Sequence, residues 1–470
     1  MTQSEFDVIV VGAGSTGLPA AIFAAQRGAR VLQIEADNRI GGTLHWSSGQ
    51  IAAAGTRLQK ERGIKDSPEA HYADAQRITD NTIDPVLGKL AIDNAADTIE
   101  WLMDLGFDMA AEAPQAGVVH EPYTVRRYYW GNNQAISILD VIRPVHDKLV
   151  SEGKIDLRLS TPMQSLLLED DRLVGVVAKD PDGNVIELRA KNVALTSGGY
   201  AANEQLWNHY NPDLPLCSHC NPYSRGAGLI AARELGAKVD GQDKFLCTFA
   251  GWLEDAGDPL SGNFYTLAPN ARKPWEIYVD VTGKRFMRED HPSIDYQEKS
   301  LLRQPGMRMF MLCDEGILQN APPICLLPEK DFKKKFGNHP NFLKSDSIDG
   351  LALQMDVAAS DLKNTVSSFN AAVDAGQDDQ FGREFLLRRI DQPPYYAMGA
   401  QGITVVSPAG LNADGKLRVL REDGSTIDNL YAAGEVLGFT RLSGNAFVGG
   451  MSLTPAMTLG RLLGQSIIQW

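Results

Sequence analysis

The N-terminal residues alternate short apolar runs with a glycine-rich turn. The apolar run Phe6 to Val11 predicts a strand that leads directly into the string Gly12-Ala13-Gly14-Ser15-Thr16-Gly17. The alanine-rich stretch 18–27 predicts a helix, and the apolar run 31–34 predicts a second strand that ends at Glu35. A strand, a glycine-rich turn, a helix and a second strand in this order predict a βαβ unit that begins a parallel sheet.

The glycines and the acid of this unit have the spacing of a dinucleotide site. We expect Gly12 to permit the tight turn, Gly14 to let the backbone approach a pyrophosphate, and Gly17 to allow close packing of helix on strand. The helix N-terminus favours the negative charge of phosphates. Glu35 is placed to accept hydrogen bonds from ribose hydroxyls, and its charge disfavours the 2′-phosphate of NADP. A purely structural glycine turn is the alternative.

The next part of the chain contains several short runs of β-forming residues. The runs 155–159, 163–168, 172–178 and 185–188 predict a small antiparallel sheet appended to the nucleotide fold. The stretch 193–200 predicts a further core strand that ends in a glycine turn.

Residues 240–403 differ in character from the rest of the chain. Aromatic residues, prolines and charges are mixed there and periodicity is poor, whereas the stretch 430–436 again predicts a buried strand that runs into a carboxylate. The sequence therefore predicts a nucleotide-binding domain made of residues 1–239 and 404–470. A separate α+β domain at 240–403 is expected to be inserted into it and to cap the substrate.

Composition limits the partners. The chain has 45 Lys and Arg against 59 Asp and Glu, and its formal net charge of -14 disfavours nucleic acid. Its five cysteines are too few and too irregular for a disulfide framework, and Cys217 and Cys220 lack the further ligands of a zinc site, so no metal is expected. The start has neither a basic n-region nor an apolar signal core, and no membrane span is expected. The expected location is the cytoplasm.

Motifs spread over nearly the whole chain resemble those of the flavoprotein subunits of fumarate reductases and succinate dehydrogenases. That superfamily also holds 3-ketosteroid dehydrogenases and urocanate reductases. The markers are Gly12 to Gly17 with Glu35, Gly41-Gly42, Thr98 to Trp101 with Gly106, Thr196 to Tyr200, Gly226 to Gly228, Gly283 to Phe286, Tyr395-Tyr396, Ala433 to Glu435, and Arg441 to Gly460. The resemblance implies an α/β fold with a Rossmann-like FAD-binding domain and an inserted α+β capping domain.

The resemblance also implies FAD as the cofactor. Non-covalent binding is expected, because the histidine that attaches flavin in some relatives falls near Thr43 in this chain. His45 and Trp46 are candidates for the face of the flavin, with a packed core pair as the alternative. The helix that opens near Ser452 is expected to stabilise anionic reduced flavin. The FAD contacts implied are Gly12, Gly14, Ser15, Gly17, Glu35, Gly41, Gly42, Thr43, Gly49, Gly198, Gly199, Gly434, Glu435, Ser452 and Leu453.

Five residues are candidates for catalysis. Arg441 matches the family arginine that holds a substrate carboxylate in fumarate reductases. The tail at Gly449 and Gly450 is closer to ketosteroid dehydrogenases, in which the amide at the position of Gly450 polarises a ketone. Ser293 stands where relatives carry their proton donor, and nearby Tyr296 is the expected substitute. Each of these residues has a structural role as the alternative.

The chain also departs from both groups of relatives. Residues 404–405 are Thr-Val where fumarate reductases place a histidine pair, so dicarboxylate clamps are absent and fumarate is disfavoured as substrate. The tyrosine of the ketosteroid dehydrogenase tail is replaced by Ala446. The stretch 123–130 is an aromatic and basic cluster that suits an anionic or aromatic ligand, or packs as a loop.

These features predict an oxidoreductase that transfers hydride between flavin N5 and a carbon α,β to a carbonyl or carboxylate. The reaction expected is dehydrogenation of a ketone or keto acid, or the reverse ene reduction. Tyr296 is expected to carry the proton, the Gly450 amide to polarise the ketone, and Arg441 to anchor a carboxylate. Because the chain has no second dinucleotide fingerprint and no haem-attachment motif, a separate electron donor or acceptor is expected. A flavoprotein subunit that needs a partner for electron transfer, and a non-enzymatic flavin-binding protein, remain as alternatives.

Overall fold

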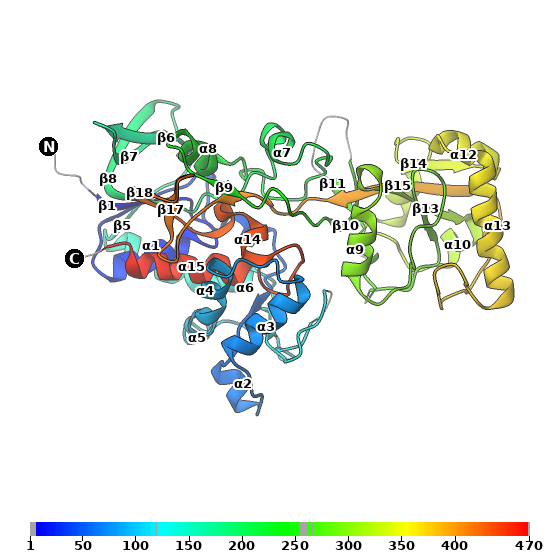
Figure 1. The fold of residues 1–470 in the computed structure, drawn as a ribbon, viewed down its shortest axis with the longest axis horizontal. Helices are drawn as coiled ribbons and strands as arrows, with labels where there is room; N and C mark the ends of the chain where they lie inside the picture. The colour runs from blue at the N-terminus through cyan, green and yellow to red at the C-terminus, as the bar shows by residue number, and fades with distance from the viewer. Residues whose placement is uncertain (1–5, 118–119, 254–260, 265–266, 270, 469–470) are drawn as a thin grey trace. The chain divides into compact units, whose positions relative to one another are not determined.

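The computed structural model describes residues 6–117, 120–253, 261–264, 267–269 and 271–468. The chain divides into two compact units (Figure 1). The first comprises residues 1–210, 220–245 and 406–470, and the second comprises residues 211–219 and 246–405. The second unit interrupts the first in sequence, as expected for an insert at 240–403. Its short segment 211–219 was expected in the first unit, and only the fold assigns it to the second.

A largely parallel sheet forms the core of the first unit. Its strands lie in the order β17 (Arg418–Leu420), β18 (Thr426–Ala432), β8 (Val185–Leu195), β1 (Phe6–Val11), β2 (Val31–Ile34) and β5 (Ile155–Arg158). β1 pairs in parallel with both β2 and β8. Every residue of β2 is buried, and so are all but one of β1, which explains their continuous apolar runs. The βαβ unit predicted from the sequence is present.

Strand β8 belongs to two pairings at once. Its first half pairs antiparallel with β7 (Arg172–Lys179), which pairs with β6 (Met163–Glu169), and its second half pairs in parallel with β1. The expectation of two separate strands here was therefore wrong. Residues 155–159 were also expected in the antiparallel sheet, but β5 lies beside β2 in the parallel sheet. A short apolar run predicts a strand without naming its partner, and long-range packing decided both cases.

Helices α1 (Gly17–Gln26) and α15 (Leu453–Ser466) lie side by side in the first unit (Figure 1). Almost all of α1 is buried, which explains its small, alanine-rich side chains. A Cβ at Gly460 or at Gly464 would lie closer than 3.0 Å to the backbone oxygens of Thr16 or Ala20, respectively. Only glycine therefore permits this helix crossing, which holds the C-terminal part of the chain against the N-terminal βαβ unit.

The other elements of the first unit are α6 and a series of short helices and strands. They are η1 (Gly42–His45), β3 (Ile51–Ala52), α2 (Arg57–Glu61), α3 (Pro68–Ile78), α4 (Leu87–Asp93), α5 (Ala95–Asp104), β4 (Tyr128–Tyr129), α6 (Ile136–Ser151), α7 (Glu204–Tyr210), α8 (Ala227–Glu234), β9 (Val239–Asp240), β16 (Gly410–Leu411), η4 (Gly434–Leu437) and α14 (Phe439–Ser443). Within the described part of the chain, no helix combines the length and apolar character needed to cross a bilayer.

The second unit is built on an antiparallel sheet. Its strands follow the order β11 (Ser261–Asn263), β10 (Thr248–Leu253), β15 (Tyr395–Ile403), β13 (Arg308–Asp314) and β12 (Ile277–Val279), and β14 (Phe342–Ser345) also pairs with β15. Its helices are α9 (Ile294–Leu302), η3 (Pro305–Met307), α10 (Glu315–Asn320), α11 (Glu329–Lys335), α12 (Ile348–Met355) and α13 (Ala359–Ala375). This is the α+β character that the sequence led us to expect.

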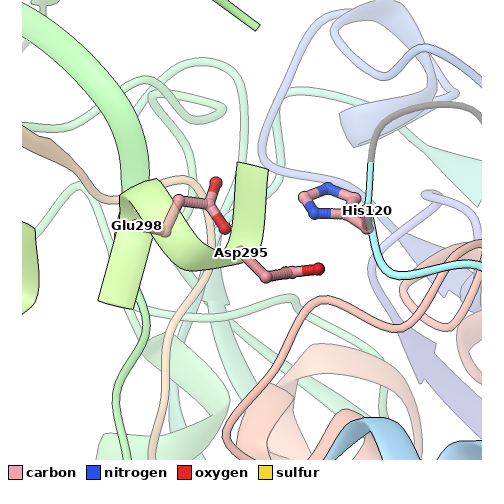
Figure 2. A group of neighbouring side chains, drawn as sticks. All are labelled: His120, Asp295 and Glu298. Atoms are coloured by element: carbon pink, nitrogen blue, oxygen red, sulfur yellow. The ribbon is translucent and has the colours of Figure 1, made fainter. Parts of the chain in front are cut away.

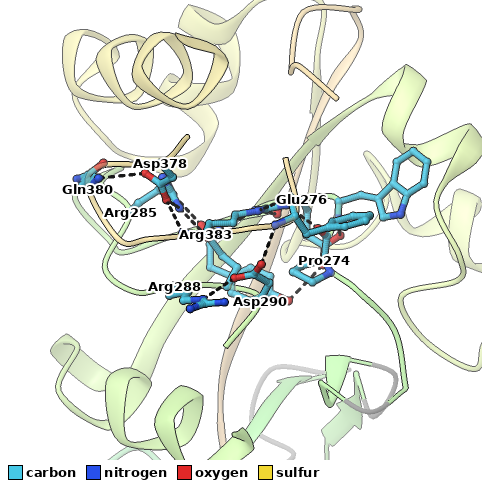
Figure 3. A network of polar contacts seen from close by, with 12 residues as sticks. Pro274, Glu276, Arg285, Arg288, Asp290, Asp378, Gln380 and Arg383 are labelled. Atoms are coloured by element: carbon cyan, nitrogen blue, oxygen red, sulfur yellow. Dashed lines mark hydrogen bonds and ion pairs between the residues drawn. The ribbon is translucent and has the colours of Figure 1, made fainter. Parts of the chain in front are cut away.

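A network of buried ion pairs crosses the second unit (Figure 3). Arg285 donates to Glu289 at 2.7 Å and to Asp378 at 2.8 Å, and all three side chains are almost fully buried. Arg383 donates to the backbone carbonyl of Glu276 at 2.8 Å. Matched carboxylate and carbonyl acceptors offset the cost of burying these guanidinium groups. The arginine of the Gly-Lys-Arg-Phe string is thus part of the framework of this unit.

We expect Glu289→Ala to lower the free energy of unfolding by about 3–5 kcal/mol, because Arg285 would stay buried without its main partner. The matched control is Glu384→Ala, which removes an exposed partner of Arg288 and should cost less than about 1 kcal/mol. Urea unfolding followed by tryptophan fluorescence measures both. Equal losses would contradict a special role for the buried network.

Candidate active site

The loop between β1 and α1 is closed by contacts of backbone on backbone. Gly12 has a φ of +105°, and a Cβ there would lie 2.6 Å from the carbonyl oxygen of Thr196. A Cβ at Gly17 would lie closer than 3.0 Å to the carbonyl oxygen of Gly12. Ser15 is buried in the same loop, just before the helix begins. The protein itself therefore requires glycine at positions 12 and 17, whatever the loop binds.

Gly14 differs, because the protein leaves room beside it. The nearest heavy atom to a Cβ at Gly14 would be the Cα of Gly42 at 3.8 Å, which is an ordinary van der Waals distance. Within the described residues, nothing thus demands glycine at position 14. Close approach of a ligand's phosphate to the backbone supplies the reason, and the start of α1 favours its negative charge. These features fit a bound pyrophosphate.

Glu35 is fixed beside this loop by two backbone donors. Its Oε2 accepts a hydrogen bond from the amide of Ala13 at 2.6 Å, and its Oε1 accepts one from the amide of Asp37 at 2.9 Å. Burial raises the pKa of Glu35, and the two amides offset part of that effect by stabilising the carboxylate. The lone pairs that remain on the two oxygens can accept hydrogen bonds from ribose hydroxyls.

A pocket of about 290 Å³ begins two residues after Glu35. Trp46 and Tyr223 have exposed fractions of 55% and 47%, so two aromatic side chains are open to a planar ring. The sequence singled out Trp46 but missed the segment 221–223, which only the fold brings to residues 37–39. The lining residues are Asp37, Asn38, Arg39, Trp46, Asn221, Pro222 and Tyr223.

The remaining expected contacts near η1 have causes inside the protein. A Cβ at Gly41 would lie 2.6 Å from Nε2 of His45, and that nitrogen is within hydrogen-bond distance of the Ile40 carbonyl at 2.9 Å. A Cβ at Gly49 would lie closer than 3.0 Å to the backbone of Ala135. Thr43 is partly buried within η1. The structure therefore gives these glycines a packing role, and their contact with FAD stays a proposal.

Glu435 lies where the loop after β8 meets the loop after β18. Its Oε1 accepts a hydrogen bond from the amide of Ser407 at 2.7 Å, and burial raises the pKa of its carboxyl group. A Cβ at Gly199 would lie closer than 3.0 Å to Glu435 Oε1 and to Ser407 Oγ. Around Gly198, in contrast, the nearest atom to a Cβ would be 3.9 Å away. Gly198 thus resembles Gly14 in leaving room for a ligand.

The peptide between Gly449 and Gly450 lies just before α15. Gly450 has a φ of +78°, and a Cβ there would lie 2.6 Å from the backbone nitrogen of Ala52. The carbonyl oxygen of Gly450 accepts a hydrogen bond from the amide of Thr454 at 3.0 Å, and the amide of Ala52 donates to Thr454 Oγ1 at 2.7 Å. Leu453 is buried. These contacts fix the backbone of Gly450 against β3, and only glycine fits there.

An apolar cluster with two tyrosines surrounds this peptide. A Cβ at Gly449 would lie 3.0 Å from the ring of Tyr128, and the hydroxyl of Tyr123 donates a hydrogen bond to the Gly449 carbonyl. The buried members of the cluster are Ala52, Ala75, Ile78, Ile83, Ile92, Tyr123, Tyr128, Ala446, Val448 and Met451. Ser452 follows the cluster and is exposed.

The rest of the stretch 123–130 packs inside the protein. Arg127 is fully buried and pairs with Asp66 at 2.7 Å and with Asp74 at 2.6 Å. The hydroxyl of Tyr129 is bound to Thr56 Oγ1 at 2.7 Å. Arg127 is therefore committed to protein carboxylates, and the expectation that it meets an anionic ligand has no support in this arrangement.

Arg441 is also surrounded by carboxylates. Its Nε donates to Asp84 at 2.9 Å, its Nη2 donates to the same carboxylate, and its Nη1 lies 3.4 Å from Asp240. The side chain is buried apart from about a tenth of its surface. A substrate carboxylate would have to share this guanidinium with two acids. The signal for these partners is absent from the local sequence, because Asp84 and Asp240 lie far from Arg441 along the chain.

Ser293 and Tyr296 belong to the second unit, at the start of α9. The ring of Tyr296 stacks on His291 with centroids 4.1 Å apart, and its hydroxyl accepts a hydrogen bond from the backbone amide of Arg288 at 3.2 Å. The hydroxyl of Ser293 does not cap the helix. The structure thus places these two residues near each other and assigns Arg441, Gly449 and Gly450 to the first unit.

The same helix carries two acids that sequence reasoning missed. Figure 2 shows Asp295 and Glu298, which are both buried in the second unit; His120, also drawn there, belongs to the first. Burial raises the pKa of Glu298 well above its usual range. The spacing of three residues on a predicted helix was the available signal for this pair.

We expect Gly14→Val to lose most bound FAD while the free energy of unfolding of the flavin-free protein changes by less than about 1 kcal/mol, because only a ligand needs the space beside Gly14. Gly17→Ala is the matched control and should destabilise the flavin-free protein by about 1–3 kcal/mol or more, because its Cβ meets backbone. Flavin absorbance and urea unfolding measure the two effects. Full flavin occupancy in Gly14→Val would place the nucleotide elsewhere.

Comparison with known proteins agrees with this site. The family model described as FAD binding domain matches residues 7–452. The chain is 27% identical to a probable fumarate reductase of Shewanella frigidimarina, over 98% of this chain and 74% of that protein. It is 25% identical to a 3-oxosteroid 1-dehydrogenase of Mycobacterium tuberculosis, over 98% of each chain. The open conformation of a flavocytochrome c3 fumarate reductase matches with a TM-score of 0.75 and 27% identity, over 98% of this chain and 78% of that one.

These matches confirm the predicted resemblance, the fold class and FAD as cofactor. The relatives differ from one another in substrate, so the family does not name the substrate of this chain. From its glycine-rich loop, its acid at the end of β2 and a match over residues 7–452, this chain belongs to the FAD binding domain family and is an FAD-dependent oxidoreductase.

Proposed function

We propose that this chain dehydrogenates a carbon–carbon bond next to the carbonyl of a ketone or keto acid, or reduces such a bond in the reverse direction. Fumarate is not its preferred substrate. The observation that carries the proposal is the backbone amide of Gly450. Within the described residues it donates no hydrogen bond, and it lies beside the apolar, tyrosine-containing cluster. An amide held rigidly in apolar surroundings is suited to polarise a carbonyl oxygen.

The other roles follow from this one. Bound FAD supplies the exchange of hydride with the substrate carbon. Dehydrogenation also removes a proton from the neighbouring carbon, and Tyr296 takes up that proton at its hydroxyl oxygen. The amide of Arg288 donates to this oxygen and stabilises its negative charge when the proton is absent. A hydrogen-bonded tyrosine is therefore a suitable acid and base.

Arg441 bears on the choice between a ketone and a keto acid. Its guanidinium is already engaged by Asp84 and Asp240, which leaves little positive charge for a further carboxylate. This supports a neutral ketone over a dicarboxylate, in agreement with the Thr-Val pair at 404–405 where fumarate reductases place histidines. We also propose that a separate electron carrier exchanges electrons with the flavin.

We expect saturated ketones to bleach oxidised flavin anaerobically, or enones to reoxidise reduced flavin, faster than succinate or fumarate do in the same assays. Tyr296→Phe should lower kcat by about 10²- to 10⁴-fold, because it removes the proton carrier. Tyr395→Phe, a change on β15 of the same unit, should leave kcat unaltered. Stopped-flow flavin absorbance measures each half-reaction. Fumarate as the fastest substrate would refute the proposal.

Arg441→Ala distinguishes an anchor from a structural arginine. We expect it to lower the free energy of unfolding by about 3 kcal/mol, because Asp84 loses its counter-ion in a mostly buried position. Arg418→Ala, which breaks a more exposed pair with Asp414, should cost less than about 1 kcal/mol. If Arg441 also anchors a carboxylate, KM for a keto acid should rise more than KM for the matching neutral ketone. A parallel change in both KM values would leave only the structural role.

A further inference from the structure

The hydroxyl of Tyr123 and the amide of Gly450 meet the same peptide group from opposite ends. Tyr123 donates a hydrogen bond to the carbonyl oxygen of Gly449, and that carbonyl belongs to the peptide whose nitrogen is the Gly450 amide. A hydrogen bond to a peptide oxygen polarises the whole group and makes its N–H a stronger donor. The two groups are therefore coupled through covalent bonds as well as through space.

The position of Tyr123 is fixed by its surroundings. Its side chain is 3% exposed, and the guanidinium of Arg127 lies over its ring at 5.0 Å from the centroid. Arg127 is held in turn by Asp66 and Asp74, so its position is determined by two buried ion pairs. The ring of His71 meets the Tyr123 ring edge-on at 5.3 Å. These contacts hold the hydroxyl in place on the Gly449 carbonyl.

A second donor extends the chain of hydrogen bonds. Nε2 of His71 lies 3.4 Å from the hydroxyl oxygen of Tyr123. Burial lowers the pKa of His71 to about 3, so its ring is neutral at pH 7. Burial also raises the pKa of Tyr123 far above its usual range, so its hydroxyl keeps the proton that it donates. In the tautomer with hydrogen on Nε2, the order of donation runs from His71 to Tyr123 to the Gly449 carbonyl.

We propose that Tyr123 is a positioning residue that strengthens the amide of Gly450 as a hydrogen-bond donor to the substrate carbonyl. It acts through the peptide that joins Gly449 to Gly450 and does not itself touch the substrate. The inference rests on the proposed function, because it needs a carbonyl oxygen at the Gly450 amide. It adds a reason why a tyrosine is buried beneath two glycines of a flavoenzyme.

Tyr123→Phe tests the inference by removing the hydroxyl and keeping the ring. The probe is 4-nitrophenolate, an oxyanion, and nitrobenzene is the matched neutral probe; both are titrated into the oxidised, FAD-loaded protein and followed by flavin absorbance. We expect Tyr123→Phe to weaken 4-nitrophenolate binding by about 2- to 10-fold and to lower kcat for ketones by a similar factor. Binding of nitrobenzene should be unchanged, because a neutral ring without an oxyanion gains little from the amide.

Tyr129→Phe is the control, because it removes an equally buried hydroxyl that is bound to Thr56 instead of Gly449. It should bind both probes as the unmodified protein does. If Tyr123→Phe does not fold, replacement of Tyr123 by 3,5-difluorotyrosine keeps the shape and makes the hydroxyl a stronger donor. That protein should bind 4-nitrophenolate more tightly.

The outcomes separate this inference from the proposed function. If the unmodified protein binds 4-nitrophenolate no better than nitrobenzene, the Gly450 amide is not an oxyanion donor, and the proposed function and this inference fail together. If the unmodified protein prefers 4-nitrophenolate but neither change at Tyr123 alters its affinity, the inference alone is overturned.

Discussion

Crowding of backbone around the first turn of α1 is the constraint on which the rest of the structure depends. Gly17 brings the turn onto the preceding loop, while Gly434 and Gly460 bring two C-terminal segments onto Thr16. A Cβ at any of these three positions would fall within 3.0 Å of protein atoms. The C-terminal part of the chain can therefore lie against the N-terminal βαβ unit only because side chains are absent here. This contact brings the acid after β18 and the start of α15 into the same unit as Glu35.

Glycines in this unit consequently serve two different purposes. Those at positions 12, 17 and 41 are explained by protein atoms that a Cβ would strike. Gly14 is not, because the nearest atom would lie at a comfortable 3.8 Å. A glycine that the protein does not need marks the place where a ligand comes closest to the backbone, and this distinction separates the cofactor site from its scaffold. The motif alone treats all of these glycines alike.

Charged groups are used mainly for the framework. Arg127, Arg285 and Arg441 are each buried and matched by carboxylates, so most of their charge is neutralised within the protein. Under the proposed function, the groups left for the substrate carbonyl are neutral dipoles: the amide of Gly450 and, behind it, the hydroxyl of Tyr123. Dipoles of this kind stabilise developing negative charge on an oxygen without requiring a charged substrate. This division is consistent with a ketone and less so with a dicarboxylate.

The sequence by itself determined the βαβ unit, its FAD-type loop, Glu35 and the interrupted arrangement of two units, because these depend on local periodicity and on residues close together in the chain. Only the tertiary structure decided that β8 continues from one sheet into another, that segment 221–223 lines the pocket after Glu35, and that Arg441 pairs with Asp84. Each of these depends on residues far apart in sequence whose approach is set by packing. The sequence gave no sign that the hydroxyl of Tyr123 would reach Gly449, because nothing local links residues that only the folded chain places in contact.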